Sequence, residues 1–314
     1  MRKLLVIALL AALLIPVFAD DGTVLPAGVF RARVIPAFGW IPGSYDKNGK
    51  YTALSTGTAT IPNLGFSLEY GITDWVTLGL QWAPGITFAS NIPMGTSTTY
   101  NMNGPSDLFA GVMVQIVGPK APVVSDVIRF DLSPGVKIPL GGVDFSTQTG
   151  STITLENPDK QTLGIGGRAY FDYVFSPSFF LDLYSQFIYY PTTVDAKYIS
   201  YYDAVYNAGL KIGYGYDLRI ELDPHYSMQL SDALTLSANC AFRYDATPDY
   251  TYSGTASYTT LHSSLFSANP SVALFFTKSV VPFELQLDYG QPLYGVSTPA
   301  TYSLDLQAKV YFKL

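Results

Sequence analysis

Residues 302–314 read YSLDLQAKVYFKL, and apolar and polar side chains alternate along this stretch. Leu304 and Leu306 belong to one set, whereas Asp305 and Lys309 belong to the other. A period of two places the two sets on opposite faces of a β-strand. This stretch is therefore predicted to be a strand with one apolar face and one polar face.

The same alternation recurs upstream and predicts an all-β chain of about twelve strands. The range is ten to fourteen strands, because residues 197–216 could hold an additional hairpin. The parity of Leu210 and Ile212 continues that of residues 217–230, which favours one long strand there. The upstream segments are residues 30–40, 64–72, 76–82, 108–116, 128–138, 163–175, 179–189, 217–230, 234–245, 264–276 and 281–289.

The connections between these segments are alternately short and long. A soluble β-sandwich would have similar connections at both ends and charged side chains on its exposed faces. Short turns on one side and long loops on the other are typical of a transmembrane antiparallel up-and-down β-barrel with both termini in the periplasm. The short connections lie near residues 73–74, 118–125, 176–178, 231–232 and 278–280, and the long ones cover roughly residues 41–61, 85–105, 140–162, 191–206, 246–261 and 290–301.

The composition excludes several classes of protein. Charged residues make up 13% of the chain and aromatic residues 15%. Disordered chains have the opposite composition, and a formal net charge of −6 provides no basic surface for nucleic acid. The single cysteine, Cys240, excludes a disulfide framework, and no cluster of His, Cys, Asp and Glu has the spacing of a zinc site. We expect no cofactor and no metal.

Residues 1–19 have the pattern of a secretory signal peptide. Arg2 and Lys3 precede an apolar core, and small residues follow at the cleavage point. A transmembrane anchor is the alternative, but the apolar run is shorter than the ~20 residues that span a bilayer as a helix. We therefore expect residues 1–19 to be removed and residues 20–314 to form a single barrel in the outer membrane of a diderm bacterium, surrounded by its lipids.

Several stretches resemble a recurrent pattern in outer-membrane transporters related to the phenol meta-pathway (MetA-pathway) family. They are LPAGVFRARV (25–34), LEYGITDWVTLGL (68–80), SDLFAG (106–111) and FDLSPGVKIPLG (130–141). Trp75 stands where that family often has a charged residue. The resemblance implies an outer-membrane barrel that takes up small solutes, including hydrophobic compounds, and it implies no catalytic residue.

The final strand also resembles the recognition signal of bacterial outer-membrane barrels. Apolar and aromatic residues occupy alternate positions up to the C-terminus, although the last residue is Leu314 rather than the usual Phe. This resemblance implies that the barrel-assembly machinery is a partner of the C-terminal strand.

The charged residues of the predicted strands all have inward parity. A charge on the lipid face would cost roughly 2–4 kcal/mol near the midplane, so a barrel explains this distribution. With His225 they form the candidate lining of the lumen. The candidates are Arg31, Arg33, Glu69, Arg129, Asp131, Arg168, Asp172, Asp182, Asp217, Arg219, Glu221, Asp223, His225, Arg243, Glu284, Asp288, Asp305, Lys309 and Lys313, and Asp107, Lys137 and Asp245 share their parity.

These charges allow two interpretations of the lumen. One is an aqueous pore whose opposed charges select polar solutes, and the other is a scaffold whose paired charges fill a narrow barrel. Pairing of the first and last strands would gather Arg31, Arg33, Lys309 and Lys313 into a basic constriction that favours anions. Glu284 on the adjacent strand could neutralise much of that charge.

Two further functions remain open. Some outer-membrane acyl hydrolases carry His-x-Ser on one strand, and His225 with Ser227 and His262 with Ser264 have this spacing. Neither pair has the third residue that would orient the histidine, so an enzyme is not expected. The Tyr-rich stretch 249–252 could instead form an adhesive surface, so an adhesin stays an alternative to a channel.

Overall fold

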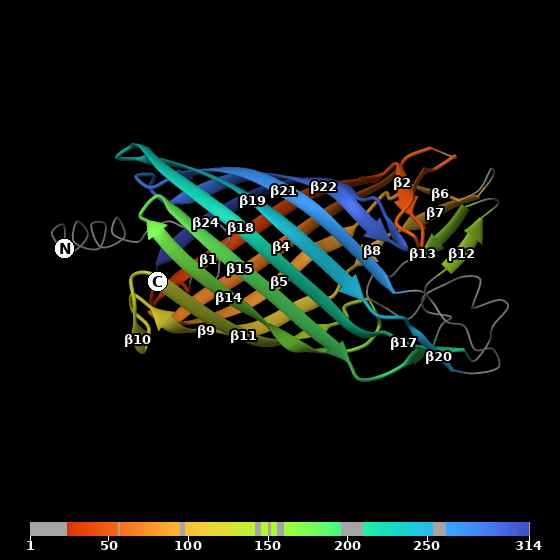
Figure 1. Cartoon of the computed structure of the whole chain (residues 1–314), viewed down its shortest axis with the longest axis horizontal. Helices are drawn as coiled ribbons and strands as arrows, with labels where there is room; N and C mark the ends of the chain where they lie inside the picture. The colour runs from red at the N-terminus through yellow and green to blue at the C-terminus, as the bar shows by residue number, and fades with distance from the viewer. Residues whose placement is uncertain are drawn as a thin grey trace.

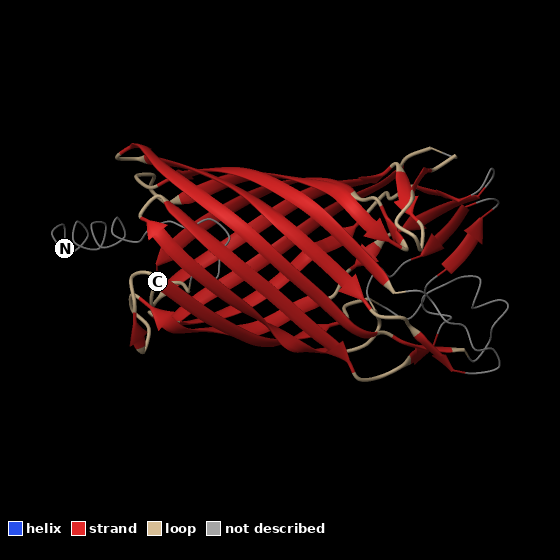
Figure 2. Ribbon diagram, in the orientation of Figure 1, coloured by secondary structure: helices blue, strands red, loops and turns tan. Residues whose placement is uncertain are grey.

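The computed structural model describes residues 24–55, 57–94, 98–141, 146–149, 152–155, 160–195, 210–253 and 262–313, so the expected signal peptide lies outside the described residues. All regular elements in these ranges are β-strands (Figure 2). None of the described segments forms a helix of the length and hydropathy that crossing a membrane requires. The long strands are β1 (Val29–Ile41), β4 (Ala59–Thr73), β5 (Val76–Thr87), β9 (Leu108–Gly118), β11 (Ile128–Ile138), β14 (Gly164–Ser176), β15 (Phe179–Tyr190), β18 (Gly215–Ser231), β19 (Leu234–Thr247), β21 (Ser263–Phe276), β22 (Phe283–Val296) and β24 (Tyr302–Lys313).

These strands form one closed antiparallel barrel, which confirms the predicted fold class. Their order around the barrel is β9, β11, β14, β15, β18, β19, β21, β22, β24, β1, β4 and β5. β24 pairs with β1, and β5 pairs back with β9, so each strand has a neighbour on both sides. A closed sheet satisfies its backbone hydrogen bonds without help from solvent, as a strand protein in lipid must.

The two ends of the barrel differ. Five short connections and both described ends of the chain lie at one end, which we call the turn end (Figure 1). The long connections lie at the other, the loop end, and contain short strands, all but β17 (Lys211–Gly213) in places where the sequence predicted only loops. They are β2 (Gly43–Tyr45), β3 (Tyr51–Ala53) and β23 (Thr298–Pro299) in one small sheet, β6 (Ile92–Met94), β7 (Thr98–Met102), β12 (Ser146–Thr149) and β13 (Thr152–Leu155) in a second, and β16 (Val194–Asp195), β17 and β20 (Thr251–Ser253) in a third.

Two further short strands extend the barrel sheet itself. β8 (Gly104–Pro105) pairs with β5, and β10 (Val123–Val124) pairs in parallel with β9.

The expected single strand through residues 210–230 is interrupted. β17 pairs with β16 and β20, whereas β18 pairs with β15 and β19 in the barrel. Gly215, the first residue of β18, has a φ of +71°, a conformation that side-chain-bearing residues rarely adopt. The preference for one long strand is therefore wrong over this part, and residues 196–209 lie outside the described residues.

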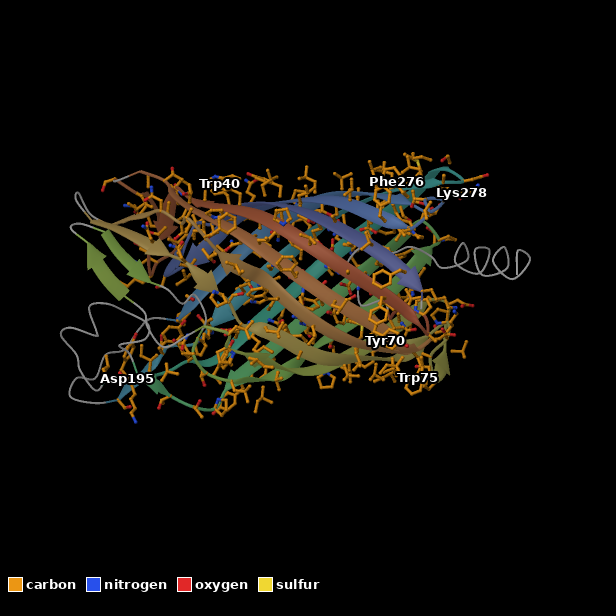
Figure 3. All side chains as sticks on the ribbon, turned by 180° about the vertical axis from the view of Figure 1, so that it is seen from behind. Trp40, Tyr70, Trp75, Asp195, Phe276 and Lys278 are labelled. Atoms are coloured by element: carbon orange, nitrogen blue, oxygen red, sulfur yellow. The ribbon has the colours of Figure 1, made fainter. Side chains whose placement is uncertain are left out.

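The outer face of the barrel is apolar and has aromatic side chains toward both ends. Figure 3 places Trp40 toward the loop end, and Tyr70 and Trp75 toward the turn end. Trp40 stacks on Tyr302 with ring centroids 5.5 Å apart. Aromatic girdles at the two membrane interfaces are a property of transmembrane barrels.

Candidate functional site

Paired charges occupy much of the turn-end half of the lumen. Lys309 is 0% exposed, and its Nζ lies 2.9 Å from Oε1 of Glu284. The same ammonium donates a hydrogen bond of 2.6 Å to Gln286 Oε1. The sequence predicted Lys309 to be part of a basic constriction, with Glu284 as a residue able to neutralise it. In the structure, Glu284 does match the charge of Lys309.

An acidic row crosses the neighbouring wall. In the register of the sheet, Asp172 lies beside Asp182, and Asp182 lies beside Asp223. Arg129 Nη1 is 3.5 Å from Asp172 Oδ2. His225 Nε2 is 2.9 Å from Asp223 Oδ2, so a basic side chain is close to each end of the row.

The imidazole of His225 is also packed from one side. Its ring stacks on Phe180 at 4.4 Å between centroids. Asn239 donates a hydrogen bond of 2.6 Å to the same oxygen of Asp223 that faces the histidine. His225 is thus held inside the barrel wall, and Asp131 is held nearby on β11, where Gln115 Nε2 lies 3.5 Å from its Oδ2.

A small cavity of about 70 Å³ lies near the first strands. Arg31 and Arg33 line it together with Glu69, which forms ion pairs with both guanidinium groups. Arg33 also donates a hydrogen bond of 3.2 Å to Gln307. We call this the inner cavity.

The N-terminal segment of the described chain lies against the wall of the inner cavity. The backbone N–H of Leu25 donates a hydrogen bond of 2.7 Å to Thr77 Oγ1, and Thr77 lines the cavity. Gly28 N–H bonds to the carbonyl of Gly71 at 2.8 Å. A Cβ on Gly71 would lie 2.1 Å from the carbonyl oxygen of Pro26, so only glycine allows this close approach.

A larger cavity of about 360 Å³, the outer cavity, occupies the loop-end part of the lumen. Its lining is dominated by charged, amide and hydroxyl groups, which a barrel exposed to water inside would present. The charged lining residues are Asp107, Lys137, Arg168, Asp182, Arg219, Glu221, Asp223, Arg243, Asp288 and Asp305, and amides come from Gln81, Gln186, Asn239, Asn269, Gln286 and Gln307.

Arg168 stands where the two cavities meet. Together with Gln81, Phe109 and Tyr170, it lines both of them. The guanidinium lies over the ring of Phe109 at 3.9 Å from the centroid. Its Nε donates a hydrogen bond of 3.0 Å to Gln186, and its Nη1 donates one to Gln81. We call Arg168 and Phe109 the waist of the lumen.

The backbone next to the waist makes room for the aromatic ring. A Cβ on Gly135 would lie 2.5 Å from Cζ of Phe109, and one on Gly111 would lie 2.8 Å from its Cε1. Both glycines lack this atom, so the ring rests on the wall of β9 and β11 and offers its other surface to Arg168. Stacking of a guanidinium on an aromatic face contributes about 0.5–2 kcal/mol.

Several charges at the loop end of the barrel are mutually paired. Arg219 Nε lies 2.7 Å from Asp245 Oδ1, and Arg243 Nε lies 2.7 Å from Glu221 Oε1. Lys160 and the hydroxyl of Tyr190 both bind the carboxylate of Asp217. These pairs stabilise the wall near the loops.

An apolar cluster covers the loop-end side of Asp217. It contains Ile188, Leu210 and Ile212, and Tyr250 packs against it. Burial raises the pKa of the Tyr250 hydroxyl to about 12, and the negative charge of Asp217 acts in the same direction.

The structure sorts the candidate lumen residues into groups. Two lysines of the predicted basic constriction do not form one. Lys309 is buried against Glu284, and Lys313 is exposed at the end of β24 and lines neither cavity. Phe109 was not singled out from the sequence, although its parity in the segment 108–116 is inward. The outer cavity gathers Arg168, Asp182, Arg219, Glu221, Asp223, Arg243, Asp288 and Asp305, the inner cavity gathers Arg31, Arg33, Glu69 and Arg168, and Arg129, Asp131, Asp172, Asp217, His225, Glu284 and Lys309 line neither.

Comparison with known proteins identifies the architecture. No family model matches the sequence, and no curated protein matches it. An outer membrane channel from Pseudomonas putida F1 has a similar structure, with a TM-score of 0.66, 15% sequence identity, and coverage of 94% of this chain and 100% of that chain. The chain therefore has the fold of an outer-membrane channel barrel, as its resemblance to outer-membrane transporters implied.

Two other solved structures are more distant from this chain. A deletion mutant of the monoaromatic hydrocarbon channel TodX has a TM-score of 0.44 and 8% identity, and covers 97% of this chain and 94% of its own. A FadL homologue from Pseudomonas aeruginosa has a TM-score of 0.40 and 10% identity, with coverage of 91% and 90%.

Proposed function

We propose that this protein is an outer-membrane channel for small hydrophilic solutes. Residues 1–19 are removed on export, and residues 20–314 form a single barrel domain. The turn end faces the periplasm, and the loop end faces the outside of the cell, which is the usual orientation of such barrels. Assembly involves the barrel-assembly machinery through the C-terminal strand.

The observation that carries this proposal is the polar outer cavity inside a closed barrel. A scaffold with a filled lumen would need no cavity of about 360 Å³ lined by charges and amides. The paired charges at the turn end narrow the path without removing the polar lining. Hydrophilic solutes fit this lining better than the hydrophobic compounds that the family resemblance included, because few apolar side chains face the cavity.

Conductance in a planar lipid bilayer tests the proposal. The purified chain without residues 1–19 should produce stepwise increases in current in potassium chloride. A protein that is correctly folded by heat-modifiable gel migration, yet conducts no ions, would contradict the channel function and support a filled scaffold.

The observations give less support to the alternative functions. Tyr250 and Tyr252 of the Tyr-rich stretch pack against the apolar cluster at the loop end, which supports a structural role for them. Asp223 is a third residue beside His225 that the sequence did not predict, but together with Phe180 it holds the imidazole inside the barrel, away from lipid substrates. We therefore infer a channel rather than an adhesin or an acyl hydrolase.

A further inference from the structure

The charges that line the outer cavity do not all act on a solute, because most of them are matched by neighbours. Arg219 and Arg243 pair with Asp245 and Glu221. Asp223 is held by His225 and Asn239.

Opposite charges also lie together elsewhere on the wall. Lys137 and Asp107 lie on neighbouring segments of the wall. The residues that follow them, Ile138 and Leu108, pair with each other between β11 and β9. Asp182 lies next to Asp172 and its partner Arg129.

Arg168 differs from these cations, because the groups that hold it are neutral. Gln186 and Gln81 accept its hydrogen bonds, and Phe109 supports its flat face. Within the described part of the chain, no carboxylate forms an ion pair with Arg168. A guanidinium has five N–H donors, so the two glutamines leave others available to a solute.

Asp288 and Asp305 provide the matching negative site. They lie side by side in the register of β22 and β24, and both line the outer cavity. The two oxygens of Asp288 accept hydrogen bonds of 2.6 Å from Gln286 and 2.9 Å from Gln307, which fix its position. Among the described residues, Asp305 has no ion pair with a cation. Like charges directly opposite each other in a sheet repel, so a bound cation would stabilise this pair.

The two sites face each other across the barrel. β14 carries Arg168 and β24 carries Asp305, and β24 is the sixth strand from β14 in either direction around the barrel. β22, which carries Asp288, is next to β24. One cavity therefore has a positive group on one wall and a negative pair on the opposite wall, with Phe109 as an apolar surface beside the cation.

We propose that the outer cavity binds small zwitterions, with their carboxylate at Arg168 and their ammonium group at Asp288 and Asp305. Opposed charges across a lumen create a transverse electric field. A dipolar solute aligns with that field. A singly charged solute is attracted by one wall and repelled by the other. The cavity volume lies within the range of small-molecule sites. This specificity rests on the proposed channel function.

The first measurement is the interruption of single-channel current by added solutes. The probes are 5-aminopentanoate, which carries both charges, and pentanoate and pentylammonium, which carry one each. The wild-type channel should be blocked at least tenfold more strongly by 5-aminopentanoate than by either singly charged probe. Arg168→Gln and Asp305→Asn should each remove most of this difference, because each deletes one of the two charges.

Matched controls remove one positive or one negative charge outside the lumen. Lys278→Gln and Asp232→Asn alter an exposed ion pair at the turn end, and their block by 5-aminopentanoate should equal that of the wild type. Equal block by pentanoate and 5-aminopentanoate, sensitive to Arg168→Gln alone, would overturn the zwitterion site in favour of an anion site.

A binding measurement separates this proposal from the channel function itself. Ligand-observed NMR on the folded barrel in detergent needs no conduction, and 5-aminopentanoate should bind at least tenfold more tightly than the singly charged probes. A barrel that conducts but shows no such preference overturns only the zwitterion site. A folded barrel that binds 5-aminopentanoate and conducts no ions overturns only the channel function.

Discussion

Lys309 shows how strongly a single residue depends on its partner in this lumen. The ammonium is fully enclosed, and Glu284 beside it is 1% exposed. Removal of one partner leaves an unmatched buried charge, which typically costs about 3–5 kcal/mol. Lys309→Met should therefore lower the free energy of unfolding by about that amount, measured by urea titration of the barrel in lipid vesicles.

A double variant provides the control for this prediction. Lys309→Met with Glu284→Gln removes both charges, so most of the lost stability should return. An equal loss in the single and double variants would show that packing, rather than the unmatched charge, explains the effect.

The sequence predicts which face each charged residue occupies but not its partner. A period of two is local, so Arg168 and Asp305 could both be assigned to the lumen from their own strands. Their roles depend on residues of other strands, such as Gln81 for Arg168 and Gln307 for the neighbouring Asp288. Those contacts depend on strand register and barrel closure, which no short stretch of sequence specifies.

At the scale of elements, the position of the segment Val24–Gly28 depends on a glycine of the barrel wall. This segment is held by a few hydrogen bonds and by its close approach to Gly71, where a Cβ would lie 2.1 Å from the Pro26 oxygen and 2.5 Å from the Leu25 oxygen. We expect Gly71→Ala to displace this segment from the wall while the barrel stays closed.

Thiol accessibility measures this displacement. In a Cys240→Ser background, a cysteine at Leu25 should react slowly with a water-soluble maleimide, because Leu25 is 5% exposed. Gly71→Ala should raise the rate at least tenfold. Gly79→Ala is the matched control on β5, since its Cβ would meet only Glu69 Cγ at 3.7 Å, and it should leave the rate unchanged.

The sequence predicts the long strands far better than the short ones. Eleven to seventeen residues of alternation identify a strand such as β18, whereas β16 and β23 have two residues each and no measurable period. The break between β17 and β18 was missed because the parity of side chains continues across Gly215. Its positive φ, rather than the pattern of hydrophobicity, redirects the chain there.

At the scale of the whole molecule, the topology predicts which residues face outside the cell. Ser55 and Ser253 lie in long connections at the loop end, and both are exposed. Ser231 is exposed at the turn end. Cysteines at Ser55 and Ser253, again in a Cys240→Ser background, should react with an impermeant maleimide on intact cells, whereas one at Ser231 should react only after the outer membrane is opened. The reverse result would contradict the proposed orientation.

The pairing of β1 with β24 has a consequence for the order of folding. Arg33 on β1 bonds to Gln307 on β24 across 274 positions of the chain, so the barrel cannot close before the last strand is synthesised. Contacts of such large sequence separation form late, because the entropy of closing the loop must be overcome first. Until then both edges carry unpaired backbone groups, which are costly in hydrocarbon and prone to pairing with other chains. A nascent chain cut short before Tyr302 would therefore retain two open edges and should be cleared by proteolysis rather than accumulate in the membrane.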